Sequence, residues 1–277
     1  MHKLIVCDLD GTLLNPHHRL GDYTRSVLAR LRARDIDVML ASGRHFQDIR
    51  TFSGQLGSHG VLISSNGAAV HDCTSRLIDC HPLEPACAIA LINEPRFADV
   101  HTNVYRTHEW LVARPEPYLL GFHEDSGFCY RVVDLRTIDG TGILKVFFYG
   151  APQRLREIEL QVRQRFGDLI TTTFSLPVTL EIMAHGVSKG AALASIAHRL
   201  GIELSEVLAF GDGMNDLDML TRVGTGIIMQ NADPRLTAAL PALAVIGSNA
   251  DESVARYLEK SFLPDPGQRP GSPYHSH

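Results

Sequence analysis

Short, continuous apolar runs that alternate with helix-forming segments constrain the fold of this chain more than any other feature. The first run is Leu4–Cys7, and similar runs cover residues 36–41, 61–65 and 207–210. A strand with helices packed on both of its faces has this composition, because neither face meets water. The alternation predicts βαβ units, and therefore an α/β fold with a doubly wound parallel sheet.

The segments between these apolar runs have the periodicity of amphipathic helices. Residues 23–34 place their apolar side chains on one helical face. A second helix is expected after Ser188, whose hydroxyl suits an N-cap, and Gly201 is the expected stop. Residues 254–262 predict a last amphipathic helix. Helices therefore follow the strands throughout the first and last parts of the chain.

The sequence pattern changes between residues 81 and 186. Prolines cluster there, and alternating segments such as 145–148 favour strands of a mixed sheet. A chain of 277 residues is also long enough for two domains. We expect one α/β domain from residues 1–80 and 187–263, with a second α/β domain inserted at 81–186. Residues 264–277 are rich in Pro and Gly, and we expect them to be a disordered tail.

Composition excludes several classes of partner. A formal net charge of -5 gives no reason to expect a nucleic acid. No apolar run approaches the roughly 20 residues of a membrane helix, and no signal-peptide cleavage site follows the N-terminus. The five cysteines contain no CxxC pair, and we expect them to be buried free thiols. The sequence predicts a cytoplasmic protein without a membrane partner, and it leaves the oligomeric state open.

Polar residues directly follow three of the predicted strands. Asp8 follows the first strand, Ser42 the second, and Asp212 follows the run at 207–210. The carboxyl ends of parallel strands lie at one edge of a sheet, where ligands bind. Lys189 lies in the first turn of a predicted helix, at the end that favours anions. We expect these four side chains to meet in one site.

Phosphoryl transfer is the chemistry that such a set suits. Asp8 is the expected nucleophile, and Asp10 is the expected acid that protonates the leaving oxygen and then activates water. Two neighbouring carboxylates repel a phosphate unless a cation lies between them, which favours Mg²⁺ as cofactor. We assign the side chains of Asp8 and Asp212 as its ligands, with Asp10 contributing its backbone carbonyl.

Other polar residues of this set suit the phosphate itself. Ser42 and Lys189 are expected to bind the non-bridging oxygens, and Asn215 offers a further donor. Asp216 is expected to orient Lys189 or a metal-bound water. Serine, lysine, asparagine and aspartate residues often have purely structural roles. Only their occurrence together in these motifs favours a phosphate-binding site.

These residues carry a resemblance to a known family. DLDGT at 8–12, Ser42 in LASGR, Lys189 in GVSKG and GDGMND at 211–216 resemble the four ordered motifs of the haloacid dehalogenase (HAD) superfamily. The large insert after the second motif resembles that of the Cof-type phosphatases with a type C2 cap, and the likeness covers roughly residues 1–262.

The resemblance implies a Rossmann-like core, a mobile cap and Mg²⁺-dependent hydrolysis of phosphomonoesters. It also implies phosphate contacts from the backbone N–H groups of Leu9 and Gly43. Within the family, residues 102–106 and 246–254 look most like the pyridoxal phosphate and sugar phosphate phosphatases of enterobacteria. The substrate implied is a small phosphorylated metabolite.

Other functions fit parts of the pattern. A calcium loop starting at Asp8 would need Gly at its sixth position and Glu at its twelfth, where this chain has Leu13 and Arg19. A P-loop motif is absent from the sequence. A phosphotransferase or mutase would use the same aspartyl phosphate, and a non-catalytic sensor of phosphometabolites would use the same binding groups. The acid at Asp10 disfavours a dehalogenase.

Four further residues have both a structural and a functional interpretation. Asn66 precedes a glycine, a pair typical of a hairpin turn, but this turn could also lie at the substrate entrance. His45 follows the second motif and could face the substrate or solvent. Glu181 and Arg106 of the insert are candidates for specificity, with structural roles equally open.

Overall fold

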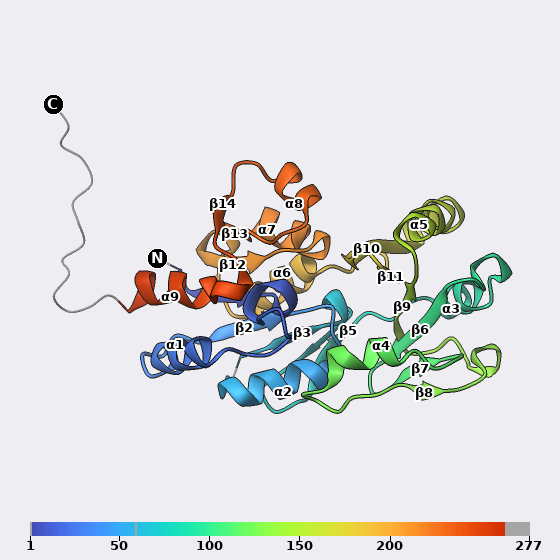
Figure 1. Ribbon diagram of the computed structural model, residues 1–277, viewed down its shortest axis with the longest axis horizontal. Coiled ribbons are helices and arrows are strands. Elements are labelled where there is room, and N and C mark those ends of the chain that lie inside the picture. The colour runs from blue at the N-terminus through green and yellow to red at the C-terminus, as the bar shows by residue number, and fades with distance from the viewer. Residues whose placement is uncertain (1, 59, 264–277) are drawn as a thin grey trace.

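The structure is a computed structural model that describes residues 2–58 and 60–263, so the predicted tail at 264–277 lies outside the described residues. Its strands form two sheets, one of eight strands and one of six. We call the larger sheet with its helices the core domain, and the smaller sheet with its helices the cap. Figure 1 shows the two bodies side by side, with the cap on the right.

The core domain contains both ends of the described chain. Its sheet has the order β14-β13-β12-β1-β2-β3-β4-β5. The strands are β1 (Leu4–Cys7), β2 (Val38–Ala41), β3 (Leu62–Ser64), β4 (Ala69–His71), β5 (Leu77–Cys80), β12 (Val207–Gly211), β13 (Thr225–Met229) and β14 (Ala244–Ile246). The helices are α1 (Asp22–Arg32), α2 (Phe46–Leu56), α6 (Lys189–Arg199), α7 (Leu217–Arg222), α8 (Pro234–Ala239) and α9 (Ser253–Phe262).

The six strands from β14 to β3 run parallel, as the apolar runs predict, and helices cover both of their faces. Alternate residues of one strand point to opposite faces. Ile5 and Cys7 of β1 therefore pack with α1, α2 and α9, while Val6 packs with α6, α7 and α8. Figure 1 shows these two groups of helices on opposite sides of the sheet.

Two short antiparallel strands, β4 and β5, extend the parallel sheet. A tight turn at Ser65–Gly67 joins β3 to β4, so the prediction of a hairpin turn at Asn66 is confirmed. β5 ends at Cys80, and the chain returns to the core domain with α6, whose first residue is Lys189. Ser188 caps α6, since its hydroxyl accepts the backbone N–H of Ala191.

The cap is built on a sheet of order β10-β11-β9-β6-β7-β8, antiparallel except for the pair β7 and β8. Its strands are β6 (His101–Arg106), β7 (Trp110–Val112), β8 (Arg131–Val132), β9 (Ile143–Tyr149), β10 (Ile170–Leu176) and β11 (Thr179–Ala184). Its helices are α3 (Pro85–Ile92), α4 (Pro117–Leu120) and α5 (Pro152–Phe166).

One face of the cap sheet packs on α3 and α5 through Val104, Val146, Phe148 and Ile182, among others. The residues between these positions point to the other face, which lines a cavity between the cap and the core domain. The strand periodicity of the cap therefore decides which of its side chains can meet a ligand.

Two further predictions are tested by the described residues. All five cysteines are free thiols, and Cys7 and Cys87 are buried as predicted. Cys80 is only partly buried, and the prediction is wrong for Cys73 and Cys129, which are exposed. Cys73 and Cys129 lie outside the helices and strands. Among residues 2–58 and 60–263, no helix has the length and apolarity that crossing a bilayer requires.

Candidate active site

Asp8, Ser42 and Asp212 lie together at one edge of the parallel sheet. Each directly follows a strand, and β1 lies between the other two strands, β12 and β2. The loop after Asp8 turns at Gly11, which has a φ of +76°. A Cβ atom at Gly11 would lie 2.1 Å from a carboxylate oxygen of Asp212, so only glycine lets this loop approach Asp212 so closely.

Three carboxylates converge at this edge. Asp8, Asp212 and Asp216 each offer an oxygen, and these oxygens lie within 4.8 Å of one another. Lys189 is fully buried beside them, with its Nζ 2.5 Å from Asp8 Oδ1 and 2.7 Å from Asp216 Oδ1. Three carboxylates against one ammonium leave an excess of negative charge, so these residues fit a bound cation such as Mg²⁺.

The pKa values of these groups reflect the crowding of charge. Burial, followed by the charge of Asp216, raises the pKa of Asp212 to about 7. Burial also raises the pKa of Asp8 well above its usual range, even though Lys189 opposes it. Burial disfavours the charged form of Lys189, but Asp216 and Asp8 outweigh burial and raise its pKa. The carboxylates therefore need more positive charge than Lys189 supplies.

Hydrogen bonds fix the orientation of the cluster. Asp216 Oδ2 accepts the backbone N–H groups of Asp212 and Gly213, at 3.0 and 2.9 Å. Asp212 Oδ1 accepts the hydroxyl of Thr12 at 2.7 Å. Asp216 thus contacts Lys189 through one oxygen and holds the loop of Asp212 through the other. This geometry suits both the orienting role that the sequence predicts and a place among the metal ligands.

Asp10 makes a contact that the sequence does not predict. Its two oxygens accept from Arg44 Nε and Nη2, both at 2.6 Å, and Oδ1 also accepts from His18 Nδ1 at 2.9 Å. Burial alone would raise the pKa of Asp10, but the charge and hydrogen bonds of Arg44 outweigh burial and hold it well below its usual range. Asp10 is therefore an ionised carboxylate in this arrangement.

The residues expected to bind phosphate lie around the same edge. Ser42 is buried after β2, and its Oγ accepts the backbone N–H of Arg44 at 3.1 Å. Ser42, Gly43 and Asn215 line the cavity together with Asp8, Asp10 and Asp212. Leu9 is buried in the hydrophobic core of the core domain, so only its backbone could serve a ligand.

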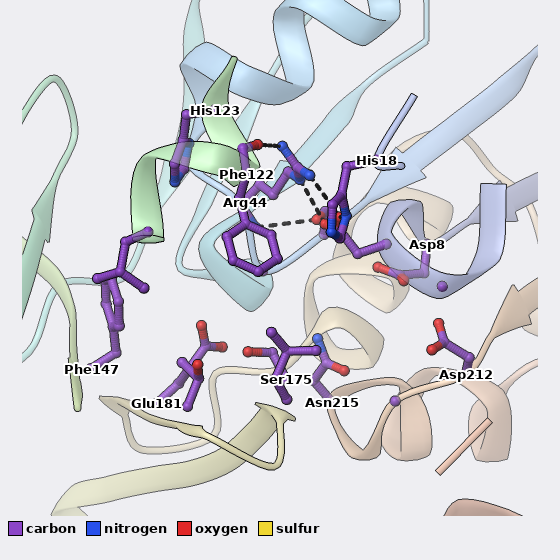
Figure 2. A pocket seen from close by; sticks show the side chains of 18 of the residues that line it. Asp8, His18, Arg44, Phe122, His123, Phe147, Ser175, Glu181, Asp212 and Asn215 are labelled. Atoms are coloured by element: carbon purple, nitrogen blue, oxygen red, sulfur yellow. Dashed lines mark hydrogen bonds and ion pairs between the residues drawn. The ribbon is translucent and has the colours of Figure 1, made fainter. Parts of the chain in front are cut away.

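The cavity has a volume of about 270 Å³ and lies between the core domain and the cap. Its core side is polar, and its cap side is mainly apolar, with Tyr105, Trp110, Phe122 and Phe147 among its walls. Figure 2 shows Asp8 and Asp212 at one end of the view and Phe147 at the other. A ligand with its phosphate at Asp8 would therefore place its remainder against the cap.

Several contacts join the cap to the site. Arg44 Nη1 donates to the backbone oxygen of Phe122, and Lys145 Nζ donates to that of Gly43 at 2.7 Å. Asn66 donates to Glu181, and its own side-chain oxygen accepts from Asn215 at 3.1 Å. Asn66 thus combines the turn with a position between cap and phosphate site.

His45 and Arg106 do not face the cavity. The His45 ring is buried, donates through Nε2 to the backbone oxygen of Arg106 at 2.8 Å, and stacks on Phe128. Arg106 itself pairs with Asp139 and is not among the residues that line the cavity. Both residues join the cap to the core domain, whereas Glu181 lies in the cavity wall.

Sequence reasoning missed Arg44, His18 and Lys145. Lys145 has a recognisable signal, since a lysine inside an apolar strand segment such as 143–149 requires a buried partner. Arg44 directly follows Ser42-Gly43, but its contact with Asp10 joins two separate loops of the core domain, and its contact with Phe122 depends on how the cap docks. Such contacts between distant segments leave no local pattern.

The sequence model of the haloacid dehalogenase-like hydrolases matches residues 5–258 of this chain. The chain belongs to that family. This HAD-like hydrolase is 42% identical over 263 residues to a Haemophilus influenzae protein, a match that covers 94% of this chain and 97% of the relative. It is 37% identical over 258 residues to the HMP-PP phosphatase of Citrobacter koseri, covering 93% and 95% of the two chains.

Solved structures carry the same fold. A haloacid dehalogenase-like hydrolase from Bacteroides thetaiotaomicron has a TM-score of 0.82 at 27% identity, covering 95% of this chain and 100% of that one. A sugar phosphatase of HAD subclass IIB has a TM-score of 0.81 at 20% identity, covering 93% and 98%. The α/β fold with a core and a cap is thus the fold of the family, as the sequence predicts.

Proposed function

We propose that this HAD-like hydrolase is an Mg²⁺-dependent phosphatase that cleaves small phosphorylated metabolites through an aspartyl phosphate on Asp8. The observation that carries the proposal is the cluster of Asp8, Asp212 and Asp216 around the buried Lys189, at the edge of the cavity between the cap and the core domain. Phosphatase relatives of nearly the same length support it.

Asp8 is the nucleophile of the proposed reaction. Its carboxylate attacks phosphorus, and the bond from phosphorus to the leaving oxygen breaks. Lys189, Ser42 and the backbone N–H groups of Leu9 and Gly43 stabilise the charge on the phosphoryl oxygens, with Asn215 as a further donor. The proposed metal ligands are Asp8, Asp212 and the backbone of Asp10, and the position of Asp216 makes it a further candidate. When bound, Mg²⁺ supplies the positive charge that the carboxylates lack.

Asp10 has two parts in the proposed cycle. It protonates the leaving oxygen in the first step, and in the second step it takes a proton from the water that attacks the aspartyl phosphate. The contact with Arg44 favours the ionised form, which suits the second step. The first step needs a protonated Asp10, so we infer that the Arg44 contact loosens when substrate binds.

The substrate is proposed as a small molecule with one phosphorylated end. The cavity volume of about 270 Å³ lies near the lower limit of ligand cavities, which is roughly 300 Å³. Relatives named HMP-PP phosphatase support such a substrate, and pyridoxal phosphate and sugar phosphates are the other candidates. The size of the cavity favours a single small ring over a nucleotide.

Phosphate release tests this proposal. The assay uses HMP-PP, pyridoxal 5'-phosphate, erythrose 4-phosphate and glucose 6-phosphate, with Mg²⁺ or EDTA. We expect release to need Mg²⁺ and to fall by at least about 1,000-fold in Asp8→Asn. Asp22→Asn changes an exposed aspartate of α1 and is the matched control.

Two results would contradict the proposal. Equal turnover in EDTA and in Mg²⁺ would show that the reaction does not need the metal. Binding of the phosphate esters without any cleavage would favour the sensor function that the sequence leaves open.

A further inference from the structure

The cap contributes a charged pair to the cavity that the proposed chemistry does not use. Lys145 of β9 and Glu181 of β11 are 2% and 3% exposed, and Lys145 Nζ lies 2.5 Å from Glu181 Oε1. A buried ion pair of this kind gives little or no stability over apolar side chains of the same size. Its presence in the wall of a cavity calls for a role other than stability.

The alternation of side chains along β9 and β11 places Lys145 and Glu181 on the face of the cap sheet that lines the cavity. Val146 and Phe148 of β9, and Leu180 and Ile182 of β11, pack toward α3 and α5. The residues between them point the other way, so Lys145 and Phe147 share the cavity face with Glu181. Figure 2 shows Glu181 and Phe147 at the end of the cavity that lies away from Asp8.

Aromatic rings surround the pair. Lys145 Nζ lies 4.8 Å from the centre of the Tyr105 ring and 5.0 Å from that of Phe147. Tyr105 and Trp110 meet edge to face at 5.7 Å, and the indole N–H of Trp110 donates to Asn103. The indole N–H is therefore satisfied within the cap, and the ring offers a surface for apolar contact. A flat ring fits between such walls better than a molecule covered with hydroxyl groups.

Both charged groups keep unused hydrogen-bonding capacity. An ammonium has three donors, and among the described residues two of them serve Glu181 Oε1 and the backbone oxygen of Gly43. A carboxylate has about four acceptor sites, and the described contacts of Glu181 are with Lys145 and Asn66. A ligand can therefore add a hydrogen bond to each group without breaking the pair. Burial lowers the pKa of Lys145, although Glu181 opposes the effect.

We propose that Lys145 and Glu181 determine specificity by binding a flat, nitrogen-containing aromatic ring in the part of the substrate that leaves. An amino group on the ring donates to Glu181, and a ring nitrogen or oxygen accepts from Lys145. Tyr105, Phe147 and Trp110 contact the ring itself. This inference rests on the proposed phosphatase function, because that function places the phosphate at Asp8 and the ring against the cap.

The pair also contacts the residues expected to bind phosphate. Lys145 donates to Gly43, and Glu181 accepts from Asn66, which in turn accepts from Asn215. A ring bound by the pair is thereby tied to the loops that hold the phosphoryl group. A purely structural role would use these same contacts, so the test must separate recognition of the ring from closure of the cap.

Three esters in the presence of Mg²⁺ make this separation with the wild-type enzyme. They are an aminopyrimidinylmethyl phosphate, benzyl phosphate and glucose 6-phosphate. Benzyl phosphate has the same flat ring without polar groups, and glucose 6-phosphate has hydroxyl groups without aromaticity. We expect kcat/KM for the aminopyrimidine ester to exceed both others by about 10- to 100-fold, as for a hydrogen bond to a charged group.

Glu181→Gln keeps the size of the side chain and removes its charge. We expect it to lower kcat/KM for the aminopyrimidine ester by about 10- to 100-fold while changing that for benzyl phosphate by less than about threefold. Glu94→Gln is the matched control, because Glu94 is another paired carboxylate of the cap that lies outside this cavity. It should leave the ratio of the two esters unchanged.

Three outcomes decide the proposal. It is overturned if Glu181→Gln slows both esters equally, since that result assigns the pair to cap closure. It is also overturned if the wild-type enzyme cleaves benzyl phosphate or glucose 6-phosphate as well as the aminopyrimidine ester, a comparison that needs no folded variant. If the wild-type enzyme cleaves none of the three, the ring-binding proposal fails, and the proposed phosphatase function fails as well only if no other ester of the phosphate-release assay is cleaved.

Discussion

Replacing Lys189 with methionine tests the electrostatic reasoning about the site. The substitution keeps a long side chain and removes the fully buried ammonium that contacts Asp8 and Asp216. Removing one partner of a buried ion pair costs about 3–5 kcal/mol, because the remaining charge is left uncompensated. At about 2–4 °C for each kcal/mol, the unfolding temperature should fall by roughly 6–20 °C in EDTA.

Thermal unfolding followed by circular dichroism measures this loss. Lys3→Met is the matched control, since Lys3 is 57% exposed and its pair with Glu206 should contribute at most about 1 kcal/mol. Excess Mg²⁺ should stabilise Lys189→Met more than the wild type, because the variant has the larger excess of negative charge at the site. The reasoning is refuted if Lys189→Met is no less stable in EDTA than Lys3→Met, or if Mg²⁺ shifts the variant and the wild type equally.

Two further predictions concern pH. Burial lowers the pKa of His45 from 6.5 to about 4, so the unfolded chain takes up this proton first as the pH falls. Stability should therefore fall by about 3 kcal/mol between these two pH values, and urea unfolding of His45→Gln should show a smaller loss. Arg44→Met removes the cation that lowers the pKa of Asp10. Because the first step needs a protonated Asp10, the alkaline limb of kcat/KM against pH should move to higher pH. An unchanged limb would mean that Asp10 does not control that limb.

The parallel strands of the core domain could be predicted closely because their signal is local. β1 and the start of β12 agree with the apolar runs to the residue, since helices on both faces leave no position for a polar side chain. β2 begins at Val38 instead of the predicted Ile36, because Asp35 has a positive φ and the chain enters the sheet only after the turn. β4 and β5 were not predicted, since they include His71 and Asp79 and form no continuous apolar run.

The residues of the site also fall into a part that local sequence predicts and a part that it does not. Asp8, Ser42 and Asp212 were predicted at one edge because each directly follows a strand, and sheet topology then brings them together. The contacts of Arg44 and Lys145 join segments about 80 and 100 residues apart in sequence, and they depend on how the cap docks on the core domain. No periodicity encodes such a contact.

The position of Arg44 explains why the core residues alone do not distinguish hydrolysis from phosphoryl transfer. Its guanidinium contacts Asp10 and also the backbone oxygen of Phe122, which belongs to the cap segment beside the cavity. A movement of this segment therefore changes the surroundings of the acid and base as well as the space open to an acceptor. Water and a second alcohol would attack the same aspartyl phosphate on Asp8, so access past the cap selects between them. In the proposed reaction, the residues that decide the outcome thus lie in the cap, although the bonds would break and form at the edge of the core sheet.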